Sequence, residues 1–360
     1  MFASSVLPLY KIIFALEQHK KNAVARWLLA GVIMIIIQTL LGGVTRLTGS
    51  GLSITEWKPI MGSIPPLNEQ DWNKAFDGYK HIGQYKYLNS DFTLADFKFI
   101  FFWEWIHRLW ARLLGVVFAV GFIYFLLRRY FDKNMIKPFI ILFLLGGLQG
   151  LIGWVMVSSG VNETNLFVDH IKLSVHFVSA MVLSCYTLWF ALKLLIPERQ
   201  RVVNSQVHTF TIIIIAVLFI QLTYGAFMAG LKGANAAPTW PTINGMWFPG
   251  TLGSNSLISD RINVHFIHRG LAYLLLLLGG IWFINGRKVM SHLFRKTSVW
   301  PIGLLLLQVV LGIITVVCAT KIVWGKFGVF ETLAEAHQLV AMFLLMALVV
   351  NLYVVKRQRI

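Results

Sequence analysis

Long apolar runs separated by short polar connections dominate the chain. Eight of these runs are close to the roughly 20 residues that a helix needs to cross a bilayer. They lie at 26–45, 103–127, 137–157, 171–196, 208–230, 263–285, 299–319 and 332–355. The pattern predicts an all-α integral membrane protein with eight transmembrane helices.

Short motifs recur in alternate helices, which indicates an internal repeat. The first, third, fifth and seventh helices carry glutamine and glycine four positions apart, at Gln38 and Gly42, Gln149 and Gly153, Gln221 and Gly225, and Gln308 and Gly312. The other four helices each carry a histidine, at His107, His176, His268 and His337. The first two of these histidines are 69 positions apart, and so are the last two. We therefore predict two pseudo-symmetric four-helix bundles.

The repeat also sets the expected domain boundaries. The first half covers 26–196 and includes a long outer loop at 46–100, and the second half covers 207–355. A linker at 197–206 joins the halves, and tails at 1–25 and 356–360 flank them. Because each half has an even number of spans, both enter the membrane from the same side, with the pseudo-two-fold axis along the membrane normal.

Charge orients these helices. The chain is 57% hydrophobic and 13% charged, with a net charge of +17. Its lysines and arginines concentrate in the two tails and in the connections at 128–137, 193–201 and 287–296. By the positive-inside rule, these connections and both termini face the inside. The positive charge therefore marks orientation in a lipid bilayer, and we expect no nucleic-acid partner.

The four histidines have one expected depth. Each lies about six residues past the predicted outer start of its helix, or roughly 9 Å below the boundary at 1.5 Å per residue. A single membrane histidine commonly makes a hydrogen bond between helices, but two equally spaced pairs at one depth favour ligands. Two imidazoles facing each other across a bundle are suited to haem iron. Zinc is disfavoured, because no cysteine or carboxylate accompanies the histidines in both halves.

Three arginines are candidates for binding haem propionates. Arg108 and Arg269 directly follow His107 and His268, and Arg46 lies at the outer end of the first helix. Guanidinium groups match carboxylates in geometry and charge. The alternative is that these arginines only anchor helix ends at the membrane interface.

The two halves differ beside the histidines. Glu104 precedes His107 by three residues and shares its helix face, whereas His265 has this position in the second half. The outer segment 45–66 of the first half is rich in Gly, Ser, Thr and Pro, and 229–250 is its shorter counterpart. We therefore predict a resident cofactor site in one half and a working site in the other. Glu104 is a candidate for proton handling, and the alternative is an ion pair with Arg108.

Several segments together resemble the heme A synthase family, in the branch shared by proteobacteria and mitochondria. The most specific segments are "GGVTRLTGSGLSITEWKPIMGSIPPL" and "FFWEWIHRLWARLLG". The others are "LQGLIGWVMVSSG", "IKLSVHF", "FIHRGLAY" and "EAHQLVA". The resemblance covers about 26–355. It departs from the family at His265, where glutamine is expected, and at Lys172, where arginine is expected.

The resemblance implies a membrane haem-dependent oxidoreductase of haem biosynthesis. Such an enzyme oxidises the C8 methyl group of haem O to the formyl group of haem A by successive hydroxylations, with loss of water from a geminal diol. The implied metal ligands are His107, His176, His268 and His337, with Glu104 as the carboxylate of the motif. A resident haem b is implied in the second half, and the substrate haem in the first.

The resemblance also implies partners and a location. The product serves cytochrome c oxidase, and the expected contacts are haem O synthase, oxidase assembly factors, an unidentified electron donor and, as an option, further copies of the chain. A multi-pass protein of the bacterial inner membrane is favoured over the mitochondrial inner membrane. The alternative function is a di-haem b protein that oxidises quinol without modifying haem. A transporter is disfavoured, because the polar groups cluster near the outer end of the helices and not at mid-membrane.

Overall fold

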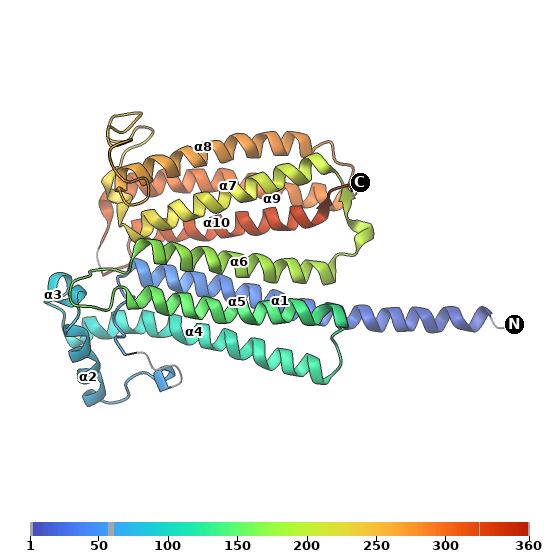
Figure 1. The fold of residues 1–360 in the computed structure, drawn as a ribbon, viewed down its shortest axis with the longest axis horizontal. Helices are drawn as coiled ribbons and strands as arrows, with labels where there is room; N and C mark the ends of the chain where they lie inside the picture. Colours follow the sequence, from blue (N-terminus) through green and yellow to red (C-terminus); the bar gives the residue numbers. More distant parts are fainter. Residues whose placement is uncertain (1–2, 57–60, 324, 359–360) are drawn as a thin grey trace.

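Helices make up almost all of the fold in a computed structural model of the chain (Figure 1). The structure describes residues 3–56, 61–323 and 325–358. Parts of the predicted outer loop (57–60), of the second half (324) and of both tails (1–2 and 359–360) lie outside the described residues.

Eight long helices form the body of the protein. They are α1 (Ala3–Leu47), α4 (Leu94–Leu127), α5 (Lys133–Ser158), α6 (His170–Leu195), α7 (Ser205–Gly230), α8 (Arg261–Gly286), α9 (His292–Val317) and α10 (Val329–Val354). Within the described residues, eight segments are long and apolar enough to cross a membrane, and each contains one of these helices or most of it. The predicted all-α membrane fold with eight spans is thus confirmed.

Shorter elements occupy the connections. They are the helices α2 (Glu69–Lys80) and α3 (Gly83–Leu88), the 3-10 turns η1 (Met61–Ser63), η2 (Glu198–Gln200), η3 (Gly233–Ala236) and η4 (Cys318–Lys321), and the two-residue strands β1 (Val202–Val203) and β2 (Val355–Lys356). The strands pair in parallel, with Val202 opposite Val355. This pairing, together with a 2.8 Å hydrogen bond from Arg201 Nε to the carbonyl of Tyr353, holds the predicted linker against the end of α10.

Two helices begin earlier than the apolar runs suggest. Helix α1 starts at Ala3, and it runs without interruption into the membrane span because residues 9–30 contain neither glycine nor proline. The predicted tail 1–25 is therefore helical over its described part. Helix α4 starts at Leu94, where Thr93 and Asp96 form a reciprocal capping box that satisfies the first backbone N–H groups. The N-terminal end of α4 therefore extends beyond the predicted start at 103.

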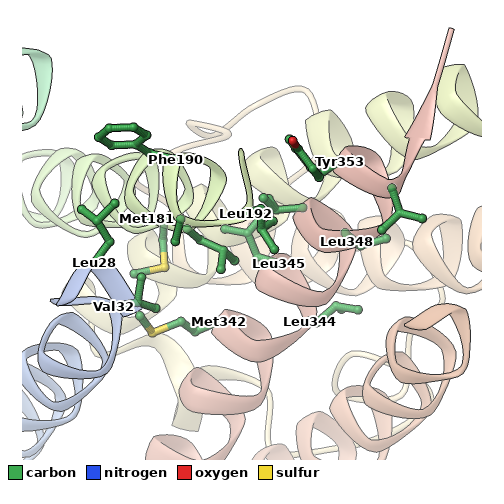
Figure 2. Packing of buried hydrophobic residues seen from close by; sticks show 14 of the residues in the cluster. Leu28, Val32, Met181, Phe190, Leu192, Met342, Leu344, Leu345, Leu348 and Tyr353 are labelled. Carbon is green, nitrogen blue, oxygen red and sulfur yellow. The ribbon is translucent and has the colours of Figure 1, made fainter. Parts of the chain in front are cut away.

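The helices group into α1, α4, α5 and α6 on one side and α7, α8, α9 and α10 on the other (Figure 1). The groups meet along α1, α6, α7 and α10, which pack against one another. Their contact surface is the hydrophobic core, with Leu28, Val32, Met181, Met342 and Leu345 among its buried members (Figure 2). Van der Waals packing of this kind drives helix association in lipid. The four remaining helices lie at the periphery.

The helices α4, α6, α8 and α10 all begin at the same end of the molecule, which we call the histidine end (left in Figure 1). The long first loop folds there against the start of α4, with α2 and α3 covering Phe97 and Ile100. Tyr79, from α2, is completely buried in this cluster, and its hydroxyl donates to Gln84 at 3.0 Å. Burial raises the pKa of Tyr79 well above its usual range. The predicted loop is thus a small packed unit at the mouth of the first bundle.

Candidate functional site

Each of the four histidines lies against a glutamine and a glycine of the preceding long helix. The sets are Gln38, Gly42 and His107; Gln149, Gly153 and His176; Gln221, Gly225 and His268; and Gln308, Gly312 and His337. The sequence repeat therefore corresponds to a fourfold structural unit, in which one helix supplies the seat for an imidazole on the next. We call each of these units a histidine seat.

The glycine of each seat leaves room for the ring. A Cβ atom on Gly153 would lie 2.8 Å from Cε1 of His176, and one on Gly42 would lie 3.0 Å from Cε1 of His107. These separations are too short for non-bonded carbon atoms. The absence of a side chain thus allows the two helices and the imidazole to occupy this position together.

The glutamine of each seat hydrogen-bonds the same imidazole. Gln149 Nε2 lies 3.2 Å from Nδ1 of His176, and Gln308 Nε2 lies 3.2 Å from Nε2 of His337. Metal-ligating histidines usually have such a partner on one ring nitrogen, which fixes the ring orientation. The glutamines were recognised in the sequence only as marks of the repeat. Their constant spacing before glycine was the available signal for this role.

The second bundle brings its two imidazoles together. The ring centres of His268 and His337 are 6.4 Å apart, and the rings are inclined by 71°. Nδ1 of each ring is buried and has no hydrogen-bond partner among the described residues. A metal ion between the rings, with bonds of about 2.0 Å to imidazole nitrogen, fits this separation. Two seated imidazoles with a spare nitrogen each match the axial ligand set of a haem.

In the first bundle, His107 on α4 and His176 on α6 have the same arrangement of seats. Gln38 Nε2 lies within 3.3 Å of both ring nitrogens of His107. The amide oxygen of Gln38 is buried without a partner in the described part of the chain. Among the same residues, no group of three or more His, Cys, Asp or Glu side chains is placed to hold a metal ion. The first pair thus has the same glutamine and glycine seats as the second.

Glu104 lies one turn before His107 and is buried with its carboxylate fully engaged. Its Oε2 accepts hydrogen bonds from Ser53 Oγ at 2.6 Å and from the backbone N–H of Ile54 at 2.9 Å. Its Oε1 accepts from the guanidinium of Arg108 at 2.5 Å. The ion pair weighed as an alternative therefore exists, and the same carboxylate also fastens the first loop over the histidine pair.

His265 is the counterpart of Glu104 in the second half. It is also buried, and its Nε2 lies 3.3 Å from the carbonyl oxygen of Ala234 in the second loop. Both residues thus hold the loop of their own half, but with opposite chemistry. The carboxylate of Glu104 accepts hydrogen bonds from the loop, whereas the imidazole of His265 donates one.

The three arginines predicted to bind propionates lie at the histidine end, and two of them donate to loop backbone. Arg108 donates to the carbonyl of Ile54 at 3.2 Å, and Arg269 donates to those of Ala237 at 2.8 Å and Thr242 at 3.2 Å. Arg46 lies in the last turn of α1, and its backbone carbonyl accepts a hydrogen bond from the ammonium of Lys232 at 3.2 Å. The guanidinium groups of Arg108 and Arg269 are thus held in place by the loops.

One buried carboxylate was missed in the sequence. Glu335, two residues before His337, points away from the second histidine pair toward α1, where its carboxylate lies against Gly43. Gln338 bridges the same two helices by donating to Glu335 at 3.4 Å and to the carbonyl of Thr39 at 3.3 Å. The only signal was the Glu-Ala-His order in "EAHQLVA", which does not show the direction of the side chain.

Eight apolar helices and two seated imidazole pairs define a membrane protein of the multi-helix, haem-binding class. Comparison with known proteins specifies the family. The chain belongs to the cytochrome oxidase assembly protein family (COX15-CtaA), whose model matches residues 25–349.

Three curated relatives named heme A synthase align with nearly the whole chain. The protein from Flavobacterium johnsoniae is 34% identical over 346 residues, which is 93% of this chain and 98% of the relative. The protein from Paracoccus denitrificans is 37% identical, covering 91% of this chain and 87% of its own length. The protein from Bradyrhizobium diazoefficiens is 37% identical, with coverages of 90% and 89%.

Proposed function

We propose that this protein is a haem A synthase, which oxidises the C8 methyl group of haem O to the formyl group of haem A. Membership of the family and the name shared by relatives that align over 98% and 87% of their own length support this activity. The protein is accordingly a haem-dependent membrane oxidoreductase, with haem O as substrate and haem A as product. The observation that carries the proposal is the pair of histidine seats in each bundle.

The second bundle is the proposed site of a resident haem b. His268 and His337 are its axial ligands, and the 6.4 Å separation of their rings supports this assignment. Arg269, fixed by two loop carbonyls, is the proposed cation for a propionate. When bound, the haem supplies one-electron redox chemistry that the side chains of the chain lack.

The first bundle is the proposed site of the substrate haem, between His107 and His176. Arg46 and Arg108 are its proposed propionate partners. Glu104 is the proposed catalytic carboxylate, because it lies one helical turn from His107 and the second half has an imidazole, His265, and no carboxylate at this position. Its three hydrogen bonds hold the carboxylate in one orientation one helical turn from His107, so that it can take up or release a proton from a fixed position.

The setting follows from the same assignment. We place the protein in a bacterial inner membrane, with the histidine end facing outward and both termini inside. Its partners are then the enzyme that supplies haem O, the assembly factors of cytochrome c oxidase, and an electron donor of unknown identity. Further copies of the chain are candidates for assembly in the membrane.

The test is conversion of haem O by the purified protein. The chain is produced in cells that make haem O, the haems are extracted, and chromatography with mass measurement identifies them. We expect haem b together with haem A or hydroxylated haem O. Two equivalents of haem b and no modified haem would instead support a quinol-oxidising electron-transfer protein.

A further inference from the structure

The two bundles differ in how completely their walls are closed. In the second bundle, each helix packs on both of its neighbours, so α7, α8, α9 and α10 form a closed ring. In the first bundle, α1 packs on α4 and α6, and α5 packs on α6. Among the residues that the structure describes, α4 and α5 form no interface of comparable extent. The first bundle is therefore open on one of its four sides.

Aromatic side chains locate the face of α5 that points toward α4. The rings of Phe139 and Phe122 are 5.7 Å apart, and those of Phe143 and Phe118 are 6.5 Å apart. These contacts fill the space between α4 and α5 at the end far from the histidines. Residues three, four and seven positions after Phe143 share its face of the helix.

Those following positions on α5 are all glycine. They are Gly146, Gly147 and Gly150, and a Cβ atom placed on any of them would meet no other atom within 4 Å. On α4, the residues three, four and seven positions before Phe118 are Gly115, Leu114 and Ala111. Leu114 packs against the hydrophobic core, and Gly115 has open space beside it. Above the aromatic contacts, the three glycines of α5 thus lie beside a side of α4 where Gly115 and Ala111 are also small.

The second bundle has larger side chains at the matching positions. Leu305 precedes Gln308 by three residues, as Gly146 precedes Gln149. The Leu305 side chain is buried against Gly279 of α8 and closes the seam between α8 and α9. In the first bundle, Phe118 on α4 has the position of Gly279, and Gly146 on α5 has the position of Leu305. A Cβ atom on Gly146 would still meet nothing within 4 Å, so Phe118 does not close this side as Leu305 closes the other.

The open side leads to the first histidine pair. Gly150 directly follows Gln149, which hydrogen-bonds His176, and lies one turn before Gly153, which lies against the ring of His176. On α4, Ala111 lies one turn after His107. The buried amide oxygen of Gln38 lacks a partner in the described residues, as do those of Gln221 and Gln308 in the second bundle, so we expect a ligand in both bundles.

We infer that the gap between α4 and α5 is a lateral portal, through which haem O enters from the lipid and haem A returns to it. The inference rests on the proposed function. A haem with a long isoprenoid chain is too apolar to cross water, and burial of its CH₂ groups in lipid favours the membrane. A substrate must enter and leave in each turnover, which an open bundle permits. A resident cofactor stays in place, as a closed bundle allows.

The test fills the gap between α4 and α5 with the side chains that the second bundle has at the matching positions of α9. The double variant Gly146→Leu and Gly150→Val introduces the residues found at the matching positions 305 and 309. The matched control is Gly303→Leu, an exposed glycine of α9 that also has open space at Cβ. Haem O is supplied in lipid vesicles, and its uptake and conversion to haem A are followed by extraction and chromatography.

We expect the double variant to take up haem O at least tenfold more slowly, while the haem b content of the second bundle and the Gly303→Leu control stay as in wild type. Conversion at the wild-type rate in the double variant would overturn the portal and leave the synthase proposal intact. Loss of a bound partner chain, with unchanged haem O uptake, would identify the glycine face as a protein contact and also overturn it. No haem A from wild type would reject the proposed function itself.

A second measurement does not depend on filling the gap. A cysteine at position 150, introduced by Gly150→Cys in a chain with Cys185→Ser and Cys318→Ala, is labelled with a membrane-permeant maleimide. We expect haem O to slow the labelling severalfold, and haem b bound only in the second bundle to leave it unchanged. Equal labelling with and without haem O would contradict the portal.

Discussion

The two bundles hold their histidines in the same way and differ in what surrounds them. In both, a glutamine and a glycine on one helix seat the imidazole of the next. In the first bundle, the residue one turn before the histidine is Glu104, and in the second it is His265. The comparison teaches that positioning the ligands and supplying acid–base chemistry are separate tasks in this fold.

The loops show the same separation. Glu104 is bonded to Ser53 and Ile54, and His265 is bonded to Ala234, so each bundle uses this position to fasten its own outer loop. Fastening a loop therefore does not require a carboxylate. The carboxylate in the first bundle must be explained by something else, and we ascribe it to the reaction.

The largest expected effect comes from removing a ligand of the resident haem. The variant His337→Ala should lose the haem of the second bundle and reduce turnover by more than the roughly 10- to 100-fold that the loss of an outer-sphere partner causes. The variant His107→Ala should keep that haem and fail to hold haem O. Haem content per chain, from absorbance and extraction, separates the two. Equal haem loss in both variants would contradict the division of roles between the bundles.

The next effect concerns Glu104. Replacement by Gln keeps the size and the hydrogen bonds from Ser53 and Ile54 but removes the charge and the proton-accepting group. We expect a roughly 10²- to 10⁴-fold lower rate of haem A formation, which is the range for loss of a general acid or base. Haem O or its hydroxylated form should accumulate.

The matched change in the other half is His265→Gln, which retains a donor for the carbonyl of Ala234. It should leave the rate close to that of wild type. Partial recovery of the rate in Glu104→Asp would distinguish chemistry from loop fastening. A His265→Gln variant as slow as Glu104→Gln would show that both positions act only through their loops.

A smaller effect is expected from the glutamines of the seats. The variant Gln149→Leu removes the hydrogen bond to His176 and should raise KM for haem O by about tenfold, at the low end of outer-sphere effects. The variant Gln308→Leu should instead weaken the second-bundle haem by a similar factor. Haem titration and steady-state kinetics of both variants measure this. Identical phenotypes would contradict separate sites for substrate and cofactor.

The sequence predicted the fold well because lipid imposes length and polarity on every span. Apolar runs located all eight helices, and the Gln-x-x-x-Gly and histidine spacings located the seats. The sequence placed the start of α4 at residue 103, whereas the helix begins at Leu94. Residues of the segment 94–102 pack in the cluster with α2, outside the apolar run that was used to locate the span. Capping by Thr93 sets that boundary, and a window of hydropathy does not detect it.

The sequence supplied candidate site residues but not their contacts. Spacing alone paired His268 with His337 and placed Glu104 beside His107. The direction of Glu335 and the missing interface between α4 and α5 depend on how helices rotate and pack, which a single-helix pattern leaves undetermined. In the sequence, Gly146 and Gly150 are equally compatible with a close contact between helices and with an open space beside the helix.

The smallest predicted effect concerns Lys232, which connects the halves. It belongs to the connection after α7, yet its ammonium donates to the carbonyl of Arg46 and lies 5.0 Å from the ring of Phe167 in the first half. Burial, and then the nearby Arg46, lowers the pKa of Lys232 to about 7 from 10.5. The folded state therefore binds fewer protons than the unfolded state between about pH 7 and pH 10.5.

It follows that the free energy of unfolding should rise with pH across this window, because deprotonation removes the cost of a buried charge. The variant Lys232→Met should abolish the rise and stabilise the protein at pH 7 by something on the order of 2 kcal/mol, allowing for partial exposure of the ammonium. Thermal unfolding in detergent, followed by circular dichroism at pH 7 and pH 9, measures it. The control Lys321→Met replaces an exposed lysine at the same end and should keep the wild-type slope. If Lys232→Met also kept the wild-type dependence of the free energy of unfolding on pH, ionisation of Lys232 would not be coupled to folding. The contact between the halves at this point would then rest on packing alone.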